Sequence, residues 1–129
     1  MRATVSIWIP GRLPGENEII DAAKSGRGKN NAYSRMKHQW TDHIAALVSE
    51  CNLPAMKLIK VKFVWFESGR QRDPDNIAAG AKFCFDGMVQ AGLIPKDTRQ
   101  HVIAFSHVFA RPGVRSGVIM RITRLDGDN

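Results

Sequence analysis

Two hydrophobic periodicities follow one another along this chain, and their order restricts the possible folds more than any other feature. Residues 4–9 alternate apolar and polar side chains, which is the spacing of a β-strand with one buried face. Residues 32–50 instead place apolar side chains at steps of three and four, which predicts a long helix with one apolar stripe. Further strands are expected at residues 58–66, 102–110 and 117–124.

The remaining segments complete the expected topology. A short helix is expected at residues 18–23 with Asn17 as its N-cap, and a second long helix at residues 76–90. Residues 111–113 read Arg-Pro-Gly, so the last two strands are expected to pair as a hairpin. This order predicts one α+β domain spanning residues 1–129, with a mixed four-stranded sheet and helices mostly on one face.

The chain is strongly basic, with a formal net charge of +7 and a pI near 9.9. A charge of this size bears on partners rather than on fold, and it favours nucleic acid. Two stretches are candidates for binding phosphate: residues 24–37, which contain no acid, and the arginines just before residue 73. Their basic residues are Lys24, Arg27, Lys29, Arg35, Lys37, Arg70 and Arg72. For the first stretch the alternative is a solvated, flexible loop.

Two classes of protein are disfavoured. No apolar run approaches the ~18 residues that cross a bilayer, so no membrane partner is expected. Cys51 and Cys84 are too far apart for a Cys-x-x-Cys zinc or redox motif, and we expect both to be structural thiols. Cysteine usage of this kind is typical of the cytoplasm, which is the expected location.

Acidic residues stand out in the segment Asp-Pro-Asp-Asn at residues 73–76. Proline favours extended backbone at the residue before it, so Asp73 and Asp75 can point the same way. Carboxylate oxygens suit a hard cation such as Mg²⁺, which can activate water against a phosphate. The alternative is structural, because this tetrapeptide is also a good turn and helix-cap sequence.

Three further charged residues are expected to join these two acids. Lys82 and Asp86 follow Asp75 on one side of the expected helix at residues 76–90, and Asp97 lies in the segment leading into the next strand. A lysine within such a cluster can stabilise charge that develops on a phosphate. The sequence therefore predicts a metal-dependent site for phosphate chemistry.

A set of residues between positions 72 and 97 matches a known pattern. It comprises Arg72-Asp73-Pro74-Asp75-Asn76, Lys82, Asp86-Gly87-Met88, Ala91-Gly92, Pro95 and Asp97, with a looser match at Pro10-Gly11-Arg12-Leu13-Pro14, Asn17-Glu18 and Met36-Lys37. This pattern resembles the RusA family of Holliday junction resolvases, in its phage and prophage branch. The resemblance implies a homodimeric endonuclease that uses Mg²⁺, or Mn²⁺ in its place, to make paired nicks in four-way DNA junctions during recombination and repair.

The resemblance also implies roles for individual residues. Asp73, Asp75 and Asp97 match the essential acids, Lys82 matches the essential lysine, and Asp86 matches a recurrent acid that could be a further metal ligand. The chain departs from the family in two ways: Lys82 follows Asp75 at a longer spacing, and a lysine stands before Asp97 in place of an acid.

Two other functions fit parts of the sequence. A catalytically inactive nucleic-acid-binding module of the same fold would explain the charge and tolerate both departures. It would bind with steep salt dependence and show no metal-dependent turnover. A basic protein-binding domain would also explain the charge, but it leaves the clustered acids without a role.

Overall fold

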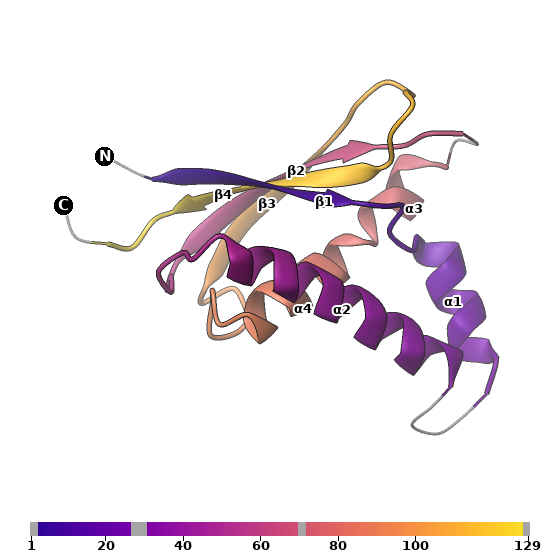
Figure 1. The fold of residues 1–129 in the computed structure, drawn as a ribbon, viewed down its shortest axis with the longest axis horizontal. Helices are drawn as coiled ribbons and strands as arrows, with labels where there is room; N and C mark the ends of the chain where they lie inside the picture. The colour runs from indigo at the N-terminus through magenta and orange to yellow at the C-terminus, as the bar shows by residue number, and fades with distance from the viewer. Residues whose placement is uncertain (1–2, 27–30, 70–71, 128–129) are drawn as a thin grey trace.

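A mixed four-stranded sheet with helices packed on one face forms the fold, as the sequence predicts (Figure 1). The computed structural model describes residues 3–26, 31–69 and 72–127. In chain order the elements are β1 (Thr4–Pro10), α1 (Glu16–Lys24), α2 (Ala32–Glu50), β2 (Ile59–Phe66), α3 (Pro74–Ala78), α4 (Ala81–Gln90), β3 (Val102–Phe109) and β4 (Gly117–Arg124). Within these ranges no helix combines the length and apolar character needed to cross a membrane.

The sheet has the strand order β1-β4-β2-β3. Strand β4 runs antiparallel to both β1 and β2, whereas β2 and β3 run parallel to each other. Alternate residues of β2 are buried. On β4 the buried residues include Val118, Met120 and Ile122, which have no exposed surface. These side chains meet α2 and α4 across one face of the sheet, and none of the described helices covers the other face (Figure 1).

The expected hairpin between the last two strands is wrong. β4 lies between β1 and β2, and the chain reaches it by crossing the end of β2. The N–H of Gly113 donates to the carbonyl of Glu67 at 3.2 Å, and the Ser116 hydroxyl accepts from the N–H of Ser68 at 3.0 Å. β4 is the strand whose three inward side chains are fully buried, and a central position provides neighbours on both sides for such a strand.

The expected helix at residues 76–90 is two helices, α3 and α4, separated at Ala79 and Gly80. The N–H of Gly80 donates to the carbonyl of Ile77, three residues back, which tightens the end of α3. A Cβ at Gly80 would lie 3.1 Å from the Trp65 ring and 3.1 Å from Leu13 Cβ. The chain therefore leaves the α-helical hydrogen-bond pattern at this turn, which packs closely against Trp65 of β2 and against Leu13.

Helix α1 begins earlier than expected, and Asn17 is not its cap. Gly15 is the N-cap residue, and its N–H donates to the Glu18 carboxylate at 2.9 Å. The N–H of Asn17 instead donates to Asn76 Oδ1 at 3.0 Å, which ties α1 to α3. Helix α2 has the bounds that the sequence predicts, and its cap Asn31 accepts from the N–H of Ser34 at 2.8 Å.

Candidate functional site

Asp73 and Asp75 lie at the start of α3, where the chain leaves the end of β2. Asp73 has extended backbone (φ −66°, ψ 150°), as the following Pro74 favours. Its carbonyl accepts from the N–H of Ile77 at 3.0 Å, while its side chain makes no capping hydrogen bond. Both carboxylates are exposed. The structural contacts of this tetrapeptide are thus made by its backbone and by the Asn76 side chain, and the two carboxylates are accessible to a ligand.

Asp97 lies at the opposite end of the sheet from these two acids. Helices α3 and α4 connect the parallel strands β2 and β3, so Asp73 follows the end of β2 while Asp97 precedes the start of β3. The eight residues of β2 span roughly 26 Å. Within the described ranges, no group of three or more acids, histidines and cysteines could hold a metal. One chain therefore does not bring the three acids together.

Lys82 and Asp86 occupy the helix between these two ends. Lys82 is exposed in the first turn of α4. Asp86 is partly buried, and its Oδ2 is fully buried with no hydrogen-bond partner among the described residues. Buried carboxylate oxygens are normally paired, so Asp86 offers an acceptor that the described part of the chain leaves unused.

Arg72 is part of an ion-pair network rather than of the exposed surface, and this network occupies the guanidinium that the predicted phosphate contact would need. Its Nε and Nη2 donate to the two Glu67 oxygens at 2.7 and 2.8 Å, and Nη1 donates to Glu18 at 2.8 Å and to the Leu13 carbonyl at 3.0 Å. Only 7% of its side chain is exposed. Burial lowers the pKa of Arg72, but Glu67 and Glu18 raise it by more, so that pKa lies above its ordinary value.

The other predicted phosphate-binding residues lie on the first two helices or outside the described structure. Lys24 is exposed at the end of α1, and Arg35 and Lys37 are exposed in the first turns of α2. The remaining predicted residues, Arg27, Lys29 and Arg70, lie outside the described residues.

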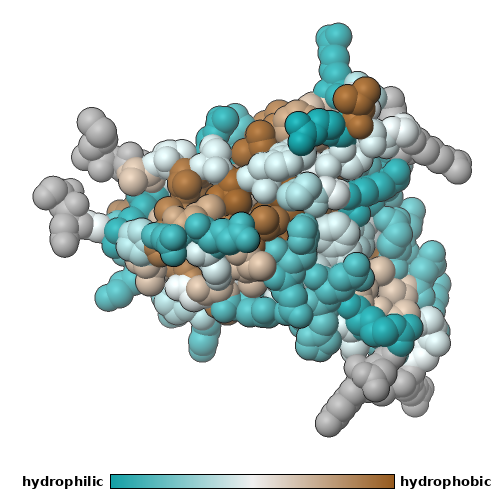
Figure 2. Space-filling view, in the orientation of Figure 1, coloured by the Kyte–Doolittle hydropathy of each residue, from teal (hydrophilic) through white to brown (hydrophobic). Residues whose placement is uncertain are grey.

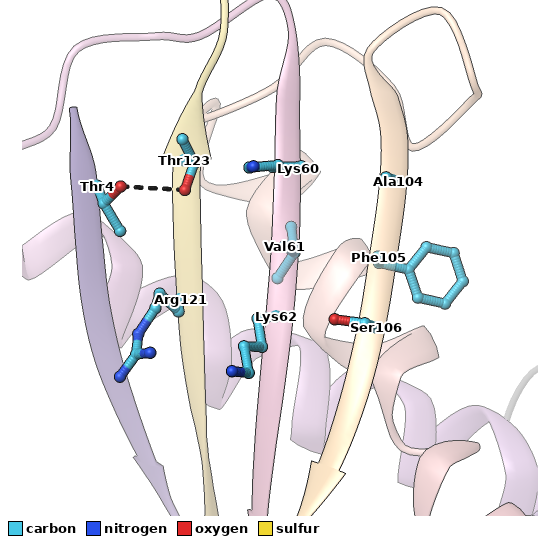
Figure 3. A pocket seen from close by; sticks show the side chains of 9 residues that line it. All are labelled: Thr4, Lys60, Val61, Lys62, Ala104, Phe105, Ser106, Arg121 and Thr123. Carbon is cyan, nitrogen blue, oxygen red and sulfur yellow. Dashed lines mark hydrogen bonds between the residues drawn. The ribbon is translucent and has the colours of Figure 1, made fainter. Parts of the chain in front are cut away.

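A second cationic group lies on the uncovered face of the sheet, and sequence reasoning did not select it. Lys60 and Lys62 on β2 and Arg121 on β4 are exposed, and Lys62 is paired directly with Arg121 (Figure 3). They line a depression of about 370 Å³. The alternation of the β2 sequence places both lysines on one face, but adding Arg121 required the pairing of β4 with β2.

Strand β3 forms one edge of the sheet and exposes large apolar side chains. Ile103 and Phe105 are 55% and 54% exposed, and Phe109 is 37% exposed. Figure 2 shows hydrophobic surface gathered over the strands. Only one edge of β3 is paired, with β2, among the strands that the structure describes. An unpaired strand edge with exposed aromatic residues is a template for pairing with another chain.

His107 connects this edge strand to the core. Its Nδ1 accepts a hydrogen bond from Trp65 Nε1 at 2.9 Å, and its ring stacks on Phe63 with centroids 5.3 Å apart. Burial lowers the pKa of His107. Because Nδ1 accepts this bond, the proton of the neutral imidazole is on Nε2, and neither ring nitrogen offers a lone pair to a metal.

No protein-family model matches this chain, and no curated protein matches it.

Proposed function

We propose that this protein is a homodimeric, Mg²⁺-dependent endonuclease that makes paired nicks in four-way DNA junctions, like the RusA-type resolvases that its sequence resembles. The observation that carries the proposal is the placement of the acids around β3, whose outer edge is unpaired among the described strands. Asp73 and Asp75 are exposed beyond the end of β2, and Asp97 is exposed just before the start of β3. Such an enzyme would act on DNA in the cytoplasm.

Pairing of two copies through β3 would reunite the acids. Two antiparallel β3 strands related by a two-fold axis place the start of one beside the end of the other. Trp65, at the end of β2, is paired with Phe109, at the end of β3. The second copy's β3 would therefore begin about two strand spacings, roughly 10 Å, from the end of β2. Asp73 and Asp75 follow that end of β2, and Asp97 precedes the incoming strand.

The same pairing accounts for the apolar edge. A two-fold axis through the middle of β3 lies next to Phe105, so the Phe105 rings of the two copies would approach each other. The apolar surface of Ile103 and Phe109 would also be covered, which stabilises the dimer by the hydrophobic effect. The axis is perpendicular to the sheet, and the helices of both copies remain on one face.

The acids of one chain do not fit a Mg²⁺ site, but those of two chains would. Asp73 and Asp75 of one copy with Asp97 of the other supply the carboxylate oxygens that Mg²⁺ prefers. Lys82 is exposed on the helix that follows Asp75, and its ammonium group is the proposed contact for the phosphate.

The test is complementation between two inactive variants, Asp75→Asn and Asp97→Asn. Each variant alone should bind a labelled four-way junction but not cleave it in Mg²⁺. When the two variants are mixed and exchange subunits, about half of the dimers are heterodimers. Each heterodimer has one intact site and one inactive site, so about a quarter of the sites in the mixture are intact. The heterodimers should therefore nick only one strand of the junction.

Two outcomes would count against parts of the proposal. Cleavage by the wild-type protein without recovery in the mixture would place each site within one chain. Absence of cleavage by the wild-type protein in both Mg²⁺ and Mn²⁺ would reject the endonuclease.

The second candidate is a nucleic-acid-binding module without nuclease activity. It is favoured by one observation, namely that the acids lie apart within the described residues of one chain. Tight junction binding that is the same in Mg²⁺ and in EDTA, with no nicked product, would support it. The lysine that precedes Asp97 would then be the first residue to replace with aspartate in search of activity.

A further inference from the structure

The uncovered face of the sheet carries positive charge, and the described strand positions on it include no acid. Arg121 is paired with Lys62 on one side and with Ser6 on the other, and Lys60 lies two residues from Lys62 along β2. Side chains two residues apart on a strand share a face and are about 7 Å apart. The three cations therefore form one group at the centre of the face (Figure 3).

No acid occupies any strand position on this face. The positions are Thr4, Ser6, Trp8 and Pro10 on β1, Gly117, Ile119, Arg121 and Thr123 on β4, Lys60, Lys62, Val64 and Phe66 on β2, and Ala104, Ser106 and Val108 on β3. Among the described residues, the ion pairs involve Arg12, Arg72 and Arg124 but none of the three cations. The charge of this face is therefore available to an external anion.

We propose that this face, defined by Lys60, Lys62 and Arg121, binds the phosphate backbone of DNA. The three cations would contact successive phosphates, and the hydroxyl groups of Thr123 and Ser106 at the margins would donate hydrogen bonds to phosphate oxygens. Contacts to phosphate carry no sequence information, so the proposed binding is independent of base sequence. The choice of DNA as the polyanion rests on the proposed function, while the binding itself requires no cleavage.

Hydroxyl groups beside the cations favour nucleic acid over an anionic membrane surface. They include those of Thr4 and Thr123, which hydrogen-bond to each other at 3.0 Å. Membrane-surface binding usually adds several apolar side chains that enter the lipid beside the cations. Among the strand positions of this face, Val108 is the one large apolar side chain that is exposed, at 41%, whereas Phe105 borders the depression from the edge strand.

The test compares two triple variants that remove the same amount of charge. The first is Lys60→Gln/Lys62→Gln/Arg121→Gln, on the sheet face. The control is Lys57→Gln/Arg99→Gln/Arg111→Gln, at exposed sites outside the strands that have no proposed role in binding. Binding to a labelled linear duplex and to a four-way junction is followed by fluorescence anisotropy in EDTA, across a salt series, after thermal melts show that both variants fold.

We expect the sheet-face variant to lose affinity by about tenfold or more for both DNAs. The slope of log K against log salt should become shallower by about two to three, because each lost phosphate contact removes about 0.9. The control should lose less than about threefold. Equal losses of affinity in both variants would show that the effect comes from net charge alone, and would overturn the proposal. Binding of the wild-type protein to phosphatidylserine vesicles but not to duplex DNA would also overturn it.

The result is separable from that of the cleavage assay. A wild-type protein that binds through this face and never cleaves would retain the inference and reject the endonuclease. A protein that cleaves junctions normally after loss of the three cations would keep the endonuclease and reject this face.

Discussion

Arg72 illustrates, at the scale of one residue, that the role of a charge depends on its neighbours. It stands beside the acidic segment in the sequence, where it reads as a phosphate contact. In the fold its guanidinium binds Glu67 through two parallel hydrogen bonds and also reaches Glu18 and Leu13. It therefore fixes the exit of β2 against the loop before α1, which positions the segment that carries Asp73.

Replacing Arg72 with alanine should destabilise the protein by about 3 kcal/mol, because Glu67 would keep a charge in a site where only 11% of its side chain is exposed. Glu18 is 45% exposed, so water compensates for the loss of its share of the interaction. Urea unfolding monitored by tryptophan fluorescence measures the change.

Arg12 provides a matched control, since it approaches the same Glu67 at 3.8 Å with 40% of its side chain exposed. Arg12→Ala should change the free energy of unfolding by less than about 1 kcal/mol. Equal effects of the two substitutions would contradict a structural role for Arg72.

At the scale of elements, the contact between α2 and α4 depends on a residue with no side chain. A Cβ at Gly87 would lie 2.5 Å from Ile44 Cγ2 and 2.8 Å from Ile44 Cβ. Ile44 is fully buried, so it has little space to move away. Gly87 thus permits the close approach of the two helices that cover the sheet.

Gly87→Ala should therefore destabilise the protein by about 1–3 kcal/mol, although alanine favours a helix by about 1 kcal/mol. The loss should shrink in an Ile44→Ala background, where the closest clashing atom, Cγ2, is absent and only the Cβ remains. Denaturant unfolding of the four proteins completes the cycle. Gly113→Ala, whose nearest atom is 4.0 Å away, should be close to neutral. A cost for Gly87→Ala that persists in full without Ile44 would show that another contact limits the packing.

At the scale of the whole molecule, the exposed edge of β3 makes the proposed dimer testable without any nuclease assay. Phe105→Glu would place two like charges beside the proposed two-fold axis and remove apolar contact area. We expect it to weaken dimerisation by more than about tenfold in sedimentation velocity experiments. Phe105 is 54% exposed, and thermal melts would establish that the monomer still folds.

Val114→Glu is the control for this experiment. Val114 is 93% exposed in the connection between β3 and β4 and lies away from the edge of the sheet. Its substitution should leave the dimer intact. A wild-type protein that is monomeric at all concentrations would contradict the dimer, and so would a Phe105→Glu variant that dimerises normally.

The sequence determined the local elements of this protein. The helix at residues 32–50 and the four strands follow from periodicities and turn residues within each segment, and the observed bounds agree closely. The extended backbone at Asp73 follows from its neighbour Pro74. These features depend on residues only a few positions apart, so they can be read without the fold.

Only the tertiary structure decided which elements meet. Local patterns do not select the partners of a strand. β4 pairs with β1 and β2, and not with β3 as the expected hairpin required. The turn at Gly80 packs against Trp65, which ended the first helix early. The parallel pairing of β2 with β3 then set Asp97 and Asp73 at opposite ends of the sheet, because the connection between parallel strands must return along their whole length.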